Sequence, residues 1–120
     1  MDVPIAPVPA QDLRIPGSRT LRLEGADVGA GISFFLVETA PGDGPALHRH
    51  PYDETFHVME GAARIRIGAQ TLDAGPGDTA VVPPRTWHRF TSTGEGVLRM
   101  MCIHASPVMI QEYAPEEEQG

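Results

Sequence analysis

Glycine and proline interrupt this chain at short intervals, and that spacing limits what it can fold into. The 120 residues include 13 glycines and 12 prolines, which divide the sequence into short apolar, β-branched and aromatic stretches. No stretch shows a 3.6-residue apolar period long enough for a main helix of the fold. Short strands separated by turns roughly every 8–12 residues are typical of a β-sandwich or barrel. We therefore expect an all-β fold.

The expected strands are the short runs between these turns. Residues 32–39 (ISFFLVET) form the strongest candidate because they are nearly continuous in apolar, β-branched and aromatic side chains. Residues 63–67 alternate alanine or isoleucine with arginine, which indicates a half-buried strand. Further strands are expected at 20–24, around His48, and at 54–60, 70–73, 79–82, 86–91 and 97–104.

The domain organisation follows from length and local composition. A chain of 120 residues fits a single domain, and residues 19–113 are expected to form it. Residues 1–18 are rich in proline, so we expect an extended arm with little structure of its own. Residues 114–120 (APEEEQG) are acidic and are expected to be a solvated, disordered tail.

Charge and cysteine content exclude several classes of partner. The formal net charge of −7 argues against nucleic acid and anionic membranes as partners. Cys102 is the one cysteine and lies in an apolar run, so no disulfide framework is expected. The N-terminal residues do not have the pattern of a signal peptide, and no apolar run approaches membrane-spanning length. The expected compartment is therefore the reducing cytoplasm.

Potential metal ligands are concentrated in residues 42–61 (GDGPALHRHPYDETFHVMEG). In an extended strand His48 and His50 point to the same face, because side chains alternate with a period of two. Glu54 has the same parity and can join them if the chain turns back into an antiparallel strand after the corner at 51–53. Two imidazoles and a carboxylate are ligands for a divalent transition metal, and His88 would supply a fourth. This donor set suits Fe, Mn, Ni, Co or Zn.

Two spaced motifs enclose these residues. The first, G-x5-HxH-x3-E-x6-G, runs from Gly42 to Gly61 without a gap. The second contains Gly77, Pro83 and His88 at the spacing G-x5-P-x4-H. In both motifs the chain resembles the cupins, a family of small β-barrels. The second motif departs from the cupin pattern at Arg85, where glycine is usual, and at Ser92, where asparagine is usual.

The resemblance implies both a fold and a ligand set. It implies a single-domain double-stranded β-helix, or jelly-roll barrel, whose mouth holds one metal ion. It implies His48, His50, Glu54 and His88 as the ligands. Arg85 leaves the turn before His88 uncertain, because glycine there normally relieves backbone strain.

Strand parity predicts which other side chains face the metal. His57 is out of phase with Glu54 and should face away, whereas Cys102 is expected to be a small core residue. His104 either lies behind the metal ligands or contacts the substrate, and Tyr52 at the corner either reaches the mouth or is purely structural. Arg85 is either solvated or offers its guanidinium to an anionic substrate. The residues expected at the substrate pocket are Phe56, Val58, Phe90, His104, Tyr52 and Arg85.

Three functions are compatible with such a site. The first is a metal-dependent monooxygenase or dioxygenase acting on a small enolisable or aromatic compound. The second is a redox-neutral metal-dependent isomerase, cyclase or lyase, and the third is a non-enzymatic module that binds a small ligand or a metal. The proline-rich arm also suggests a two-fold homodimer, in which the arm of one chain covers an exposed sheet edge of the other.

Overall fold

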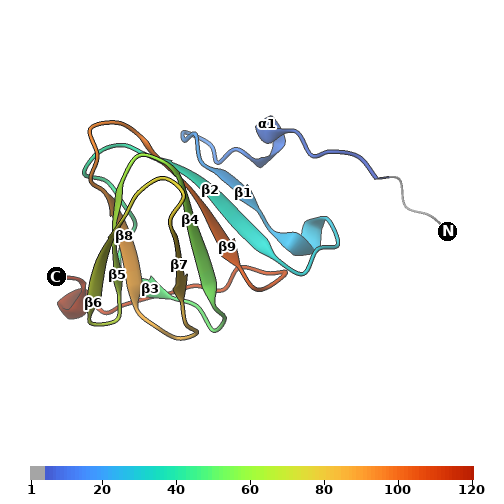
Figure 1. The fold of residues 1–120 in the computed structure, drawn as a ribbon. Helices are drawn as coiled ribbons and strands as arrows, with labels where there is room; N and C mark the ends of the chain where they lie inside the picture. Colours follow the sequence, from blue (N-terminus) through green and yellow to red (C-terminus); the bar gives the residue numbers. More distant parts are fainter. Residues whose placement is uncertain (1–4) are drawn as a thin grey trace.

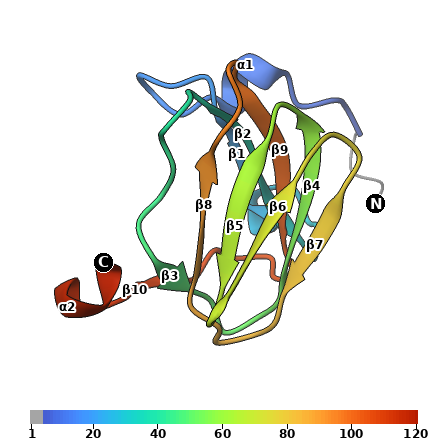
Figure 2. The same ribbon diagram turned by 60° about the vertical axis from the view of Figure 1, so that its left-hand side comes forward.

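A computed structural model describes residues 5–120, so residues 1–4 of the expected arm lie outside the described residues. The described chain folds into two five-stranded antiparallel sheets that face each other (Figures 1 and 2). The first sheet has the order β1 (Leu21–Leu23), β2 (Ser33–Thr39), β9 (Leu98–His104), β4 (Glu54–Glu60) and β7 (Thr79–Val82). The second has the order β10 (Glu112–Tyr113), β3 (His48–Arg49), β8 (His88–Ser92), β5 (Ala63–Ile67) and β6 (Gln70–Ala74). The predicted jelly-roll barrel is confirmed.

The hydrophobic core lies between the inner faces of the two sheets. Strand β9 shows the alternation most clearly, because Leu98, Met100 and Cys102 are buried while the residues between them are partly exposed. Phe56 from β4 and Ile65 from β5 meet them from either side. Each fully buried side chain of this size contributes about 1.5–3 kcal/mol. The core therefore fixes the relative positions of β4, β8 and β9, which carry polar residues at one end.

Strand register brings polar residues of each sheet directly opposite one another. In the first sheet Glu54, the first residue of β4, pairs with His104, the last residue of β9. In the second sheet His48 of β3 pairs with His88 of β8. All four side chains are buried at the same end of the barrel. The register thus assembles a polar cluster without any long loop.

Gly61 closes the first motif at a point where a side chain cannot fit. Its φ is +86°, and a Cβ atom there would lie 2.5 Å from the carbonyl oxygen of Val97. Backbone strain and this clash should make Gly61→Ala lower the free energy of unfolding by about 2–3 kcal/mol. Urea unfolding measures this, with Gly96→Ala as control because a Cβ there meets nothing within 4 Å. Equal losses for the two variants would contradict this account of Gly61.

The two terminal segments contain more structure than their composition predicts. The arm includes a short helix, α1 (Ala10–Leu13), and its described residues 5–12 are exposed and lead away from the barrel (Figure 1). A 3-10 turn, η1 (Gly25–Asp27), follows β1. The expected homodimer through the arm stays a prediction. No helix among the described residues is long and apolar enough to cross a membrane.

Residues 114–120, expected to be a solvated, disordered tail, are mostly exposed and include one helical turn. The tail forms a short helix, α2 (Glu116–Gln119). The side-chain amide of Gln119 accepts a hydrogen bond from the Leu47 N–H (2.8 Å) and donates one to the Leu47 carbonyl (3.0 Å). These bonds satisfy backbone groups next to β3. The acidic composition of the tail predicted only that it is solvated. The contact of Gln119 with the backbone of Leu47 could not be predicted, because a single side-chain contact over 72 residues has no recognisable sequence pattern.

Candidate metal centre

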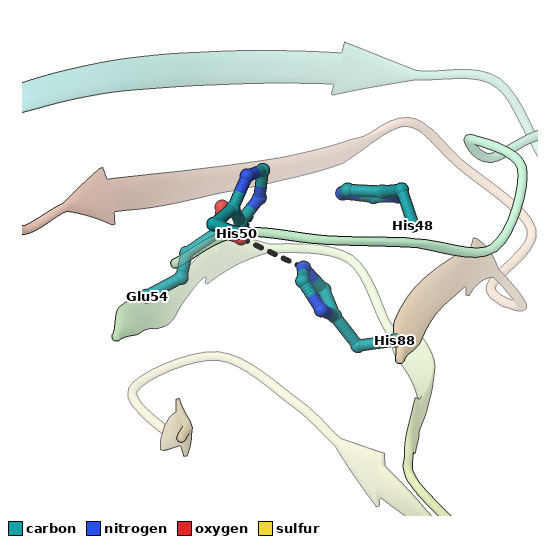
Figure 3. Close-up of side chains that lie close together, drawn as sticks. All are labelled: His48, His50, Glu54 and His88. Atoms are coloured by element: carbon teal, nitrogen blue, oxygen red, sulfur yellow. Dashed lines mark hydrogen bonds and ion pairs between the residues drawn. The ribbon is translucent and has the colours of Figure 1, made fainter. Parts of the chain in front are cut away.

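The four predicted ligands converge at the mouth of the barrel (Figure 3). His48 and His88 come from β3 and β8, Glu54 begins β4, and His50 lies in the corner between β3 and β4. One ligand atom from each residue lies within 4.8 Å of the others. All four side chains are buried, the most exposed being His48 at 6%. The structure therefore brings together the complete set that the spacing indicated.

Backbone carbonyls orient the three imidazoles of this set. Nδ1 of His48 lies 2.7 Å from the Ala46 oxygen, and Nδ1 of His88 lies 2.8 Å from the Thr86 oxygen. Nδ1 of His50 lies 2.8 Å from the oxygen of Ile110. A carbonyl oxygen can only accept, so each Nδ1 must carry the hydrogen. Each Nε2 then presents a lone pair, the form in which a histidine binds metal.

The charges in the cluster suit a cation. Nε2 of His50 and Nε2 of His88 lie 3.1 and 2.9 Å from Oε1 of Glu54. Two lone pairs and a carboxylate oxygen repel one another unless a positive charge lies among them, which is a metal ion or, in the metal-free protein, a proton shared with the histidines. Burial alone would raise the pKa of Glu54, but contacts with His104, His50 and His88 outweigh it and hold that pKa well below its usual value. The group can hold one metal ion, and its donors fit a divalent transition metal.

The surroundings of His48 keep its imidazole in the neutral form that binds metal. Burial lowers the pKa of His48 to about 4, and the neighbouring His88 and His50 add to this effect against the hydrogen bond to Ala46. The imidazole is therefore neutral at neutral pH. Metal can bind there without displacing a proton, which would otherwise compete with it.

His104 lies behind Glu54 rather than in the ligand set. Its Nε2 is 3.1 Å from Oε2 of Glu54, and its Nδ1 is 2.6 Å from the hydroxyl oxygen of Tyr52. The Tyr52 ring lies parallel to the imidazole of His50, with centroids 5.1 Å apart. The hydroxyl of Tyr52 is thus engaged with His104, and Tyr52 does not line the cavity that opens beside His48 and Glu54.

A cavity of about 340 Å³ opens beside the cluster, and His48, Glu54 and His104 form part of its wall. Most of the remaining wall is apolar, with Phe56 and Phe90 packed edge to face at a centroid distance of 5.8 Å. The polar residues of the wall outside the histidine–glutamate cluster are neutral. They are Ser18, Thr20, Thr39, Gln111 and Tyr113. No arginine is among the described residues that line this cavity.

Comparison with known proteins points to the same family as the two sequence motifs. The cupin domain family matches residues 35–104, more than half of the 120 residues. This chain belongs to the cupin family. The germin-like protein subfamily T member 3 of Arabidopsis thaliana is 33% identical over 109 residues, which cover 84% of this cupin and 43% of the relative. The chain spans about half the length of the curated relatives it matches.

Solved structures share the cupin barrel. The oxalate decarboxylase of Lactobacillus farciminis, solved as a formate complex, superposes with a TM-score of 0.76 at 22% identity, over 86% of this chain and 34% of that one. A cupin 2 domain-containing protein of Halorhodospira halophila gives a TM-score of 0.72 at 24% identity, over 88% and 78% of the two chains. At these identities the likeness shows the fold alone.

The predicted pocket residues of this cupin divide into two groups. Phe56, Phe90 and His104 line the cavity. Val58 does not, although its parity is inward, because it is packed into the hydrophobic core below Phe56. Parity gives the direction of a side chain and not its depth in the barrel. His57 is exposed, as its parity predicted, and its Nδ1 lies 2.8 Å from the Thr79 hydroxyl.

Arg85 replaces the usual cupin glycine and does not line the cavity beside His48 and Glu54. Its φ of +59° is the left-handed conformation that glycine favours, and its N–H donates to the carbonyl of His50 at 2.7 Å. The residue lines a separate pocket of about 210 Å³, whose wall also includes Arg49, Glu112 and the candidate ligand His50. The backbone therefore keeps the turn geometry that the substitution had placed in doubt, and Arg85 does not line the cavity beside His48 and Glu54.

Sequence reasoning missed the part of the cavity wall that the terminal segments build. Ile15, Ser18 and Thr20 come from the arm and the residues after it, and Gln111 and Tyr113 come from the segment after β9. Of the two adjacent phenylalanines on β2, Phe35 lines the cavity and Phe34 does not. Short polar segments of this kind carry no periodic pattern, so nothing in the sequence indicated their position.

Proposed function

We propose that this cupin is a metal-dependent oxygenase of a small enolisable or aromatic compound. The observation that carries the proposal is the cavity beside His48 and Glu54, whose walls are mostly apolar and whose polar groups outside the metal cluster are neutral. Such a wall binds an organic ring or chain by burying apolar surface. A divalent transition metal in the cluster would supply Lewis acidity and, if it is iron, manganese or nickel, redox chemistry with O₂.

The cavity wall also limits the class of substrate. Besides the metal, a sugar phosphate or a dicarboxylate would gain charge-assisted hydrogen bonds from arginine, and no arginine lines the cavity among the described residues. Oxalate, after which the structurally similar decarboxylase of Lactobacillus farciminis is named, is a small dianion and would leave most of the 340 Å³ unfilled. A β-dicarbonyl or a phenol fits better, because its enolate or phenolate oxygen could meet a metal ion held by His48 and Glu54 while its carbon skeleton contacts Phe56 and Phe90.

Redox-neutral chemistry has less support because it requires a free acid or base near the substrate. Both nitrogens of His104 are engaged, one with Tyr52 and one with Glu54. Burial raises the pKa of the Cys102 thiol well above its usual value, so the thiol stays protonated at neutral pH and offers no thiolate as a base. Neither His104 nor Cys102 is therefore free to transfer a proton, and the apolar residues beside the cavity would orient a substrate and exclude water.

Oxygen uptake tests the proposal. The protein is loaded separately with Fe(II), Mn(II), Ni(II) and Zn(II) and mixed with a β-diketone, a catechol and a flavonol. We expect O₂ consumption with at least one redox-active metal and none with Zn(II), which has no redox chemistry. His88→Ala should abolish uptake, whereas His57→Ala should retain it because His57 is exposed on the outer face of β4.

Other results would favour the other two functions. Conversion of a compound without O₂ consumption, in the Zn(II) form as well, would indicate an isomerase, cyclase or lyase. Tight binding of a panel compound without any conversion would indicate a non-enzymatic ligand-binding module. Either result would overturn the oxygenase proposal while leaving the metal site in place.

A further inference from the structure

We propose that His104 and Tyr52 are positioning residues that hold Oε2 of Glu54 away from the metal, so that Oε1 alone serves as the ligand atom. This inference rests on the metal-binding part of the proposed function. It concerns two residues outside the four-residue ligand group, both of which contact that group directly.

The two oxygens of Glu54 have different neighbours. Oε1 lies among the ligand nitrogens, 3.1 Å from Nε2 of His50 and 2.9 Å from Nε2 of His88. Oε2 points to the other side and lies 3.1 Å from Nε2 of His104. His104 stands directly across the β4–β9 ladder from Glu54 and is only 1% exposed. The strand pairing therefore holds one imidazole against one carboxylate oxygen.

The hydrogen bonds around Tyr52 determine which nitrogen of His104 carries the hydrogen. The N–H of Ile110 can only donate, so the Tyr52 oxygen accepts from it at 3.2 Å. The hydroxyl hydrogen then has two possible acceptors, Nδ1 of His104 at 2.6 Å and the Ile110 carbonyl at 3.5 Å. The 3.5 Å contact with that carbonyl is at the outer limit of a hydrogen bond, whereas the 2.6 Å contact with Nδ1 of His104 is short and strong. The hydroxyl therefore donates to Nδ1 of His104.

Donation from Tyr52 fixes the tautomer of His104. With its Nδ1 acting as an acceptor, the neutral ring carries its hydrogen on Nε2, which donates to Oε2 of Glu54. The opposite tautomer would place a lone pair 3.1 Å from a carboxylate oxygen and would be repelled. The chain of bonds runs from the Ile110 N–H through Tyr52 and His104 to Glu54. It leaves Oε1 as the oxygen available to the metal.

The test compares metal affinity and the visible spectrum of the Co(II)-loaded protein, which reports the ligand geometry directly. Tyr52→Phe keeps the ring parallel to His50 and removes only the hydroxyl, and His104→Leu removes the donor to Oε2. Each should weaken Co(II) binding about tenfold or more, measured by competition with a chelating dye, and should change the spectrum. His57→Leu, an exposed histidine on the same strand as Glu54, should change neither.

A conservative variant separates positioning from a general packing role. His104→Gln keeps an N–H donor that does not depend on the tautomer, so it should restore most of the affinity lost in His104→Leu. Adding Tyr52→Phe to His104→Gln should then cost little, although Tyr52→Phe alone is costly. Equal losses from Tyr52→Phe in both backgrounds would overturn the proposed chain of hydrogen bonds.

The failure of this inference can be told apart from the failure of the metal site. If wild-type protein binds Co(II) and Tyr52→Phe and His104→Leu match it in affinity and spectrum, the positioning role is overturned while the metal site stands. If wild-type protein takes up no Co(II), Mn(II), Fe(II), Ni(II) or Zn(II), the metal site fails and the positioning role fails with it. Far-UV circular dichroism confirms that each variant is folded.

Discussion

Glu54→Gln is expected to lower the metal content of the purified protein at least about tenfold while the barrel stays folded. The substitution keeps the shape of the side chain but removes the negative charge from a group that is only 3% exposed. A cation among three neutral imidazoles then loses the one anionic ligand of the predicted set. Loss of a residue that merely supports a ligand costs about 10–100-fold in affinity, so loss of a charged ligand should cost no less.

Elemental analysis of protein purified in parallel measures this effect. His88→Ala should show a loss of similar size, because His88 is fully buried and provides a second contact to Oε1 of Glu54. His57→Ala serves as the matched control for histidine removal, since His57 is exposed. Full metal occupancy in a His48→Ala/His50→Ala double variant would refute the ligand set. Circular dichroism should show an intact barrel throughout, because the core comes from the strands.

Much of the barrel was predictable because alternation and turn residues are local signals. Residues 54–60, 63–67 and 79–82 form strands at the predicted bounds. The convergence of the candidate ligands was predictable for the same reason, since His48, His50 and Glu54 lie close in sequence and share one parity. Only His88 comes from a distant strand, and its motif spacing located it.

Non-local features were not predictable in this way. The contact between His104 and Glu54 depends on the register of β4 with β9, and strand parity alone left two roles open for His104. Val58 has inward parity, yet its depth in the core keeps it from the cavity. The terminal segments were the hardest case. The contribution of Ser18 and Gln111 to the cavity wall depends on tertiary packing of polar segments that have no periodicity.

Metal-free protein is expected to lose stability steeply as the pH falls from about 6.5 to about 4. The pKa of His48 is 6.5 in an unfolded chain and about 4 in the folded one, where burial disfavours the charged ring. Between these values the unfolded chain binds more protons, so acid favours unfolding, and this one group removes about 3 kcal/mol. Protonation of Glu54 lowers the stability further at more acidic pH. Its folded pKa lies well below 4.5, and its contribution to stability is lost as the pH falls below 4.5 and through that folded pKa.

Urea unfolding of chelator-treated protein at about pH 7.5, 6.5, 5.5 and 4.5 tests the expectation. The informative quantity is the difference between wild type and His48→Gln, because other groups that titrate are common to both. The amide does not titrate, so the loss of stability between pH 7.5 and 4.5 should be smaller in His48→Gln by about 2.5 kcal/mol. His57→Gln should follow the wild-type profile, since its histidine is exposed. Parallel profiles for wild type and His48→Gln would show that burial does not hold His48 neutral, and His48 would then need to lose a proton before it could bind metal at mildly acidic pH.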